Sequence, residues 1–315
     1  MMLVDAVLAQ AVSLMADGEL VEAERVLQTG LMAMPLEADL HLTKAVAVQA
    51  QGRLRESITG FWEALAAKPN LKGARTALIE SLVTLQTEPD KLRDFSLESG
   101  ERQTALRMDA IRADHLARYE VAARWLRQRQ LRGRDRTGID VFSGNGYGSR
   151  LVATMTGARM LGLDGSEDAV KLAERHYSNH RIVFGHALFP FALQPGVADF
   201  AICFESAEHV ADPLALLHQI SEATDGPIFV SVPLDEGLPF ADNSDLFVYH
   251  SRHFTRADIR SALAEIGRPV ILEEWGQVVY RMNGSRMCGL LPPAMMGVGR
   301  LEPDSQFMVL VAERA

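Results

Sequence analysis

The sequence predicts an α/β protein: a sheet built from alternating strands and helices, preceded by a small all-α domain of helical repeats. Three observations lead to this prediction. The first hundred residues repeat with a period of 34, and from residue 138 short apolar strands alternate with helices around a glycine-rich turn. The length of 315 residues suits about two domains. We expect repeats over 1–100, a basic linker helix within 101–137 and an α/β domain over 138–315.

The repeat appears when the sequence is shifted by 34 residues. The shift aligns residues of the same kind, namely Gly18 with Gly52, Leu20 with Leu54, Glu22 with Glu56, Leu31 with Leu65 and Pro35 with Pro69. Small residues let two helices approach closely, and each proline ends the second helix of a unit. A third helix, Leu71 to Leu85, is predicted as a cap. A further shift of 34 maps Gly52 onto Gln86, so the repeat pattern ends there.

The repeat resembles the tetratricopeptide repeat in its period and its positions, although the usual aromatic residue of the first helix is absent. Such repeats imply a groove for a peptide or a protein partner. With only two repeats, a packing arm or a homodimer contact explains the segment equally well.

The junction between the two parts is a polar loop followed by a basic helix. Glu88 to Gly100 is the predicted loop, and residues 101–137 hold ten Arg, no Lys and five acids. Apolar residues recur there at helical spacing: Ala105, Ile111, Leu116, Tyr119, Ala122 and Leu126. We interpret the basic residues as a solvated face, or the helix as docked on the acidic repeats, rather than as an RNA or membrane contact.

The second part alternates strands and helices along its length. The predicted strands are Gly138–Ser143, Leu161–Asp164, Arg181–Gly185, Ala198–Phe204, Pro227–Val232, Pro269–Glu274 and Gln306–Ala312. Predicted helices follow the glycine turn up to Thr154, start at Ser166, and cover Ala211–Glu222 and Ala257–Ile266. Such a sheet carries helices on both faces and binds its ligand at the carboxyl ends of its first strands.

Composition excludes several classes of function. The net charge of −9 removes the electrostatic reason to propose a nucleic-acid partner. No apolar run reaches the ~18 residues that a membrane helix needs. Two cysteines cannot form a disulfide framework, so we expect a cytoplasmic protein without a membrane span.

A glycine-rich turn follows the first strand of the predicted sheet. Gly144, Gly146 and Gly148 come after Asp140, and Asp164 ends the next strand. Glycines let a ligand approach the backbone closely, and the amides at the start of a helix bind negatively charged groups. An acidic residue at the end of the second strand suits a ribose diol. A nicotinamide site needs a third glycine at position 149, which is Ser149.

Together with other stretches, this turn resembles the class I S-adenosylmethionine-dependent methyltransferases over about residues 112 to 315. The matching stretches are His115 to Tyr119, Ile139 to Ser149, Gly162 to Ser166, Asp199 to Pro213, Val232-Pro233 and His253 to Thr255. The resemblance implies a Rossmann-like, seven-stranded sheet whose last strand runs antiparallel to the others. It also implies S-adenosylmethionine as the cofactor.

The resemblance assigns roles to single residues. Gly144 and Gly146 would border the methionine moiety, Asp140 would hold its amino group, and Asp164 would hold the ribose. Gly148 is a further cofactor-binding residue. The remaining cofactor contacts implied are His186 and Ala187 at adenine, Glu205 beside the sulfonium, and Tyr119. Three residues depart from the family pattern: Phe142, Ser143 and His186.

The chemistry needs alignment of donor and acceptor, and a base if the acceptor must lose a proton. The candidate catalytic residues are His209, Glu205 and His253, with His250 as a further candidate base. Glu205, Glu208 and His209 form an E-x-x-E-H pattern that also occurs in quinone-pathway O-methyltransferases. This pattern predicts a site for Mg²⁺ or Mn²⁺; alternatively, Glu208 and His209 only support the loop.

The acceptor is not determined by the sequence. Two segments that would cover it are Leu234–Ser251 and Met282–Pro303, and the second suits either a mobile lid over an apolar acceptor or a plain surface loop. We expect a hydroxyl of a small molecule, a sugar or glycan, or a quinone-like compound. The alternative is a degenerate methyltransferase fold that works as a cofactor-binding scaffold or a protein-interaction module.

Overall fold

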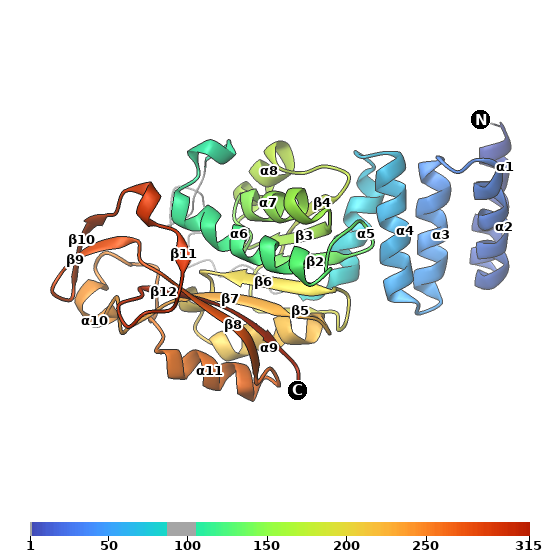
Figure 1. Cartoon of the computed structure of the whole chain (residues 1–315). Helices are drawn as coiled ribbons and strands as arrows, with labels where there is room; N and C mark the ends of the chain where they lie inside the picture. The colour runs from blue at the N-terminus through green and yellow to red at the C-terminus, as the bar shows by residue number, and fades with distance from the viewer. Residues whose placement is uncertain (1, 87–104) are drawn as a thin grey trace.

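The computed structural model describes residues 2–86 and 105–315. A row of helices is followed by a mixed sheet with helices on both faces (Figure 1). The predicted loop Glu88 to Gly100 and the boundary at residue 100 lie outside the described residues.

The N-terminal helices follow the predicted period. They are α1 (Met2–Ala16), α2 (Leu20–Ala33), α3 (Ala38–Ala50), α4 (Leu54–Ala67) and α5 (Lys72–Leu82). The bounds of α2 and α4 differ by 34 at both ends, and Gly18 and Gly52 before them have φ of 81° and 80°. A left-handed residue at both places explains why glycine recurs there. The second helices of the two units, α2 and α4, therefore keep the predicted spacing of 34 residues.

The predicted cap helix is shorter than expected. It ends at Leu82, and Val83–Gln86 forms strand β1 instead. This strand pairs antiparallel with β5 (Phe191–Leu193). The β-branched Val83 and Thr84 favour a strand once a partner is available.

The main sheet has the strand order β11-β8-β12-β7-β6-β2-β3-β4. Its strands are β2 (Thr137–Val141), β3 (Arg159–Asp164), β4 (Ile182–His186), β6 (Phe200–Phe204), β7 (Ile228–Pro233), β8 (Val270–Gln277), β11 (Val298–Gly299) and β12 (Phe307–Glu313). β12 runs antiparallel to β7 and β8, as the resemblance implied. The seven predicted strands are present, and the two-residue β11 adds an eighth at the edge beside β8.

Helices cover both faces of this sheet. One face carries α6 (Ala113–Gln128), α7 (Tyr147–Thr156) and α8 (Glu167–His176), whose apolar residues pack with Met160, Ile182 and Phe200. The basic helix α6 is therefore docked on the sheet and not on the acidic repeats, because Tyr119, Ala122, Ala123 and Leu126 are buried in this core. The expectation that it docks on the acidic repeats is wrong, whereas its basic side is a solvated face, since Arg124 and Arg129 are half exposed.

The opposite face carries α9 (Pro213–Ala223), α11 (Arg256–Glu265) and the N-terminal helix α5. Parallel strands are usually joined by a helix, but the connection from β4 to β6 holds only the short strand β5. Leu78 and Leu82 of α5 are fully buried there with Leu163 and Val183. The N-terminal region thus supplies a helix of this layer (Figure 1).

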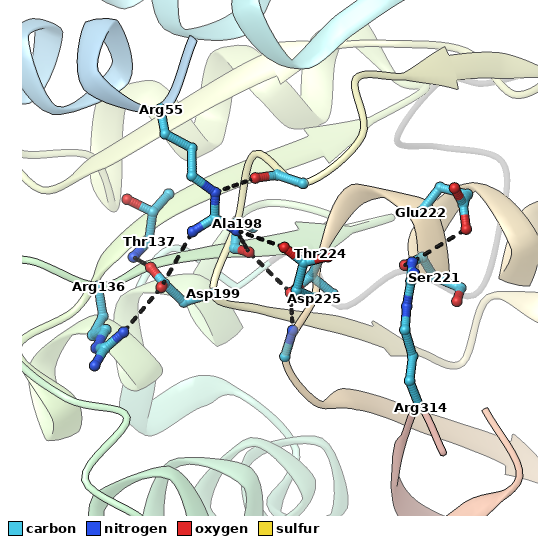
Figure 2. Close-up of polar contacts among 12 residues, drawn as sticks. Arg55, Arg136, Thr137, Ala198, Asp199, Ser221, Glu222, Thr224, Asp225 and Arg314 are labelled. Atoms are coloured by element: carbon cyan, nitrogen blue, oxygen red, sulfur yellow. Dashed lines mark hydrogen bonds and ion pairs between the residues drawn. The ribbon is translucent and has the colours of Figure 1, made fainter. Parts of the chain in front are cut away.

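Polar contacts also join the N-terminal helices to the sheet (Figure 2). Arg55 of α4 donates to the carbonyl of Ala198 at 3.1 Å and lies 3.8 Å from the Asp199 carboxylate. Asp199 in turn accepts hydrogen bonds from Arg136 and from the amide of Thr137. Two further ion pairs cross the junction, Arg75 to Glu174 at 2.9 Å and Arg159 to Glu63 at 2.7 Å.

Candidate cofactor and catalytic site

The glycine turn after β2 has the geometry of a ligand-binding loop. Gly146 caps α7 with φ of 88°, and a side chain there would collide with Phe184. The amide of Gly144 donates to Oδ2 of Asp164 at 2.9 Å, which joins the turn to the end of β3. A Cβ at Gly144 would meet no atom within 4 Å, so space remains above this residue.

Asp140 is a buried carboxylate at the centre of the site. Its oxygens accept hydrogen bonds from Tyr119 at 3.1 Å and from Ser149 at 2.6 Å. Burial without any solvent exposure raises the pKa of Asp140 to about 7, although these two hydrogen bonds oppose the shift. A cation placed beside this carboxylate would favour its charged form.

Tyr119 reaches this site from α6. A Cβ at Gly148 would lie 2.1 Å from the Tyr119 ring, so only glycine permits this contact. Burial, followed by the charge of Asp140, raises the pKa of Tyr119 well above its usual value. The phenol therefore stays protonated and donates to Asp140.

Asp164 ends β3 and lies at the start of α8. Its second oxygen accepts from the amide of Ser166 at 2.8 Å, and Ser166 caps α8. The predicted adenine loop is next to it: the amide of Ala187 donates to the Asp164 carbonyl, and Nε2 of His186 lies 3.0 Å from the carbonyl of Gly165. Asp164, His186 and Ala187 therefore lie together at the carboxyl ends of β3 and β4.

The N-terminal region also reaches this loop. A Cβ on Gly185 would lie 2.7 Å from two side-chain atoms of Ile79 in α5. Ile79 therefore packs directly on the strand that leads into His186 and Ala187.

Arg118 is a site residue that sequence reasoning did not assign. Only 1% of it is exposed, and its Nε donates to Gln277 at 2.8 Å. The guanidinium lies 3.5 Å from Asp114 and 3.7 Å from Glu205, and it stacks over the ring of Phe307. Within the described residues its Nη2 makes no hydrogen bond. The sequence did contain a signal for this role. Arg118 precedes Tyr119, a core residue of the same helix, and an arginine beside the buried side of a helix indicates a buried charge with a function.

Glu205 follows β6 with a left-handed φ of 50°. Its carboxylate accepts from the hydroxyl of Ser231 at 2.8 Å and faces Arg118. These partners hold Glu205 on the side of the site toward α6. The non-glycine Phe142 also has a positive φ, 61°, at the place where the family usually has a small residue.

The predicted metal residues separate into two groups. Glu208 and His209 lie in a short 3₁₀ turn, η2 (Ala207–His209), and His250 joins them. Among the described residues, these three form the group whose donor atoms all lie within 4.8 Å of one another, and Glu205 is not in it. His253 is buried behind His250, with 3.0 Å between Nδ1 of His250 and Nε2 of His253.

The two predicted cover segments form an apolar wall beside these histidines. The first contains helix α10 (Phe240–Asn243). The second begins within strand β9 (Tyr280–Asn283) and contains strand β10 (Arg286–Leu290). A separate small core joins them, with Leu238, Phe247, Val279, Met296 and Phe307 buried. The second segment contributes the buried Met296 to this core, while most of its other side chains are exposed.

Comparison with known proteins places the chain in a family. The family model described as a methyltransferase domain matches residues 113–271, half of the chain, so the chain belongs to this family. Its class of activity is S-adenosylmethionine-dependent methyl transfer, and it is an enzyme of this class. No curated protein matches the chain.

Two solved structures are similar to part of this chain at low sequence identity. One is magnesium protoporphyrin IX methyltransferase from Synechocystis PCC 6803 with bound S-adenosylhomocysteine, at 19% identity and a TM-score of 0.47, covering 69% of this chain and 90% of its own. The other is an S-adenosylmethionine-dependent methyltransferase from Mesorhizobium loti, at 16% identity and a TM-score of 0.46, covering 62% of this chain and 100% of its own. In the described part of the chain, no helix combines the length and apolar character that crossing a bilayer requires.

Proposed function

We propose that this enzyme transfers the methyl group of S-adenosylmethionine to a hydroxyl of a small molecule, a sugar or glycan, or a quinone-like compound. One observation supports the proposed cofactor site most strongly. A buried guanidinium and a buried carboxylate, Arg118 and Asp140, are linked through the adjacent Tyr119. An amino acid group carries one charge of each sign, so this pair suits the methionine end of the cofactor.

The remaining cofactor contacts follow from this orientation. Arg118 would bind the methionine carboxylate through Nη2, and Asp140 would bind the ammonium group. Gly144, Gly146 and Gly148 would border the methionine chain. Asp164 would accept from the ribose hydroxyls, with His186 and Ala187 at adenine.

The reaction is an in-line displacement. The acceptor oxygen attacks the methyl carbon, the C–S bond breaks with its electron pair passing to sulfur, and S-adenosylhomocysteine leaves. The hydroxyl proton passes to a base, for which His209 is our first candidate. Glu205 would lie beside the sulfonium, and His253 would act on His250 rather than on the acceptor.

The acceptor is proposed to be partly apolar. Phe240, Phe247 and Tyr280 line the side of the histidine cluster, and the rings of Phe247 and His250 are 4.9 Å apart. Aromatic walls with a few polar groups suit an amphipathic or ring-shaped acceptor.

The N-terminal helices are proposed to be tetratricopeptide-like repeats with a packing role and a binding role. A groove of 470 Å³ lies between them, and its lining includes Glu24, Gln28, His41, Lys44, Glu56 and Glu63. Such a groove suits a protein partner or a second copy of this chain. The exposed thiol of Cys288 suits the cytoplasm that we propose as its location.

The test is methyl transfer from S-adenosylmethionine labelled on its methyl group to an extract of cells that lack this protein. A labelled product that requires wild-type protein, and whose rate falls ten- to hundredfold with Asp164→Asn at subsaturating cofactor, supports the proposal. Cofactor binding without any labelled product favours the alternative, a scaffold that binds the cofactor.

A further inference from the structure

Three donor side chains from two distant segments meet beside the methyl-transfer site. Glu208 and His209 follow β6, and His250 belongs to the segment after β7, about forty residues later. One donor atom from each lies within 4.8 Å of the other two. The backbone holds the segments together, since the amide and hydroxyl of Ser251 both donate to the Glu208 carbonyl at 2.8 Å.

The hydrogen bonds of His209 determine which nitrogen is the basic one. Its Nδ1 lies 3.1 Å from the carbonyl of Tyr249. A carbonyl only accepts hydrogen bonds, so Nδ1 carries the proton and Nε2 holds the lone pair of the neutral ring. Nε2 is also the nitrogen on the side of Glu208, 3.9 Å from its Oε1.

The same reasoning applies to His250 through a chain of two rings. Nδ1 of His253 lies 2.6 Å from the carbonyl of Leu238 and therefore donates to it. Nε2 of neutral His253 then accepts from Nδ1 of His250, at 3.0 Å. This leaves Nε2 as the basic nitrogen of His250. Metal-binding histidines are typically oriented by such a hydrogen bond from their other nitrogen.

The carboxylate completes the donor set. Glu208 has no solvent exposure, and a buried carboxylate is stabilised by a cation among its neighbours. Two imidazole nitrogens and one carboxylate favour Zn²⁺, Mn²⁺, Co²⁺ or Fe²⁺ over Mg²⁺, which prefers oxygen. Three protein ligands leave coordination positions open for water or a ligand oxygen.

We infer that Glu208, His209 and His250 bind one divalent transition-metal ion, with His253 as the residue that orients His250. This differs from the sequence prediction, because His250 replaces Glu205 and the preferred ion is not Mg²⁺. Binding of the ion does not require the proposed function, and only a role of the ion toward the methyl acceptor rests on it. The two assignments of His209 are alternatives, because an Nε2 that holds the ion cannot also accept the proton of the acceptor.

The experiment uses the full chain, purified without a histidine tag and stripped of metal, and titrates it with Co²⁺ while recording visible absorption. We expect one Co²⁺ per chain and ligand-field bands from nitrogen and oxygen donors. His250→Ala and Glu208→Gln should each weaken binding a hundredfold or more. His253→Asn should weaken it less, by about tenfold, since it acts through orientation.

Two controls define the donor set. His218→Ala, on the exposed side of α9, should leave Co²⁺ binding unchanged. Glu205→Gln should also leave it unchanged, and a tenfold loss there would overturn the proposed donor set. Absence of stoichiometric Co²⁺ binding by folded wild-type protein, or equal binding by His250→Ala, would overturn the site. Calorimetry with S-adenosylhomocysteine on the same sample tests the cofactor site separately.

Discussion

The hydroxyl of Tyr119 lies 3.1 Å from Oδ1 of Asp140, which connects helix α6 to the first strand of the sheet. The next residue along α6 toward its start, Arg118, ion-pairs with Glu205 after β6. Two consecutive side chains of one helix thus contact the ends of two neighbouring strands. This relationship makes α6 part of the proposed cofactor site.

The first prediction concerns pH. Without cofactor, the pKa of Asp140 is about 7, and the ammonium group of the cofactor would lower it. Binding then releases a proton, so affinity should rise about tenfold from pH 6 to pH 8 and level off above. Calorimetry with S-adenosylhomocysteine across this range measures the effect. A flat profile for the wild type would show that Asp140 does not bind the ammonium group; Asp140→Asn should give a flat profile and weaker binding.

The second prediction concerns Arg118. Arg118→Met removes the charge-assisted bond to the methionine carboxylate and should weaken cofactor binding by about 2–3 kcal/mol, or thirtyfold or more. The control is Arg124→Met on the same helix, where the side chain is half exposed and pairs with Glu120. Equal affinities of the two variants would contradict the assignment. Circular dichroism confirms that each variant is folded.

A third prediction concerns the ribose. Asp164→Asn removes the charged acceptor and should cost about 1.5–3 kcal/mol, a ten- to hundredfold loss of cofactor affinity. Asp168→Asn, on the exposed first turn of α8, is the matched control. An unchanged dissociation constant for Asp164→Asn would place the ribose elsewhere.

The fourth prediction concerns the N-terminal helices. A chain beginning at residue 101 loses α5, whose Ala74, Leu78 and Leu82 are fully buried. The exposed apolar face of the sheet should make this truncation aggregate, as seen by size-exclusion chromatography and dye binding. A soluble, monomeric and fully active truncation would contradict both the packing role and the binding role.

Much of the fold follows from local sequence signals. The 34-residue period gave helices with matching bounds, because Gly18 and Gly52 both need a left-handed turn. The seven strands were predictable, since buried parallel strands are apolar runs between turn residues. Thr255 and Asp258 form a capping box at the start of α11, and this spacing of a threonine and an acid is a local signal for a helix start.

Other features depend on contacts between distant segments. The docking of α6 on the sheet could not be inferred from the ten arginines in residues 101–137. A pattern of charges does not indicate which part of the protein packs against the apolar side of a helix. Arg118 is a site residue only because Gln277, Asp114 and Glu205 meet around it. His250 joins Glu208 only because Ser251 holds the inserted segment against η2.

The most direct test of the account is calorimetric titration of the full chain with S-adenosylhomocysteine at pH 8. We predict one site per chain, with affinity lost in Asp164→Asn and Arg118→Met and kept in Asp168→Asn and Arg124→Met. Absence of binding heat from folded wild-type protein, together with no shift of its melting temperature by the ligand, would contradict the account.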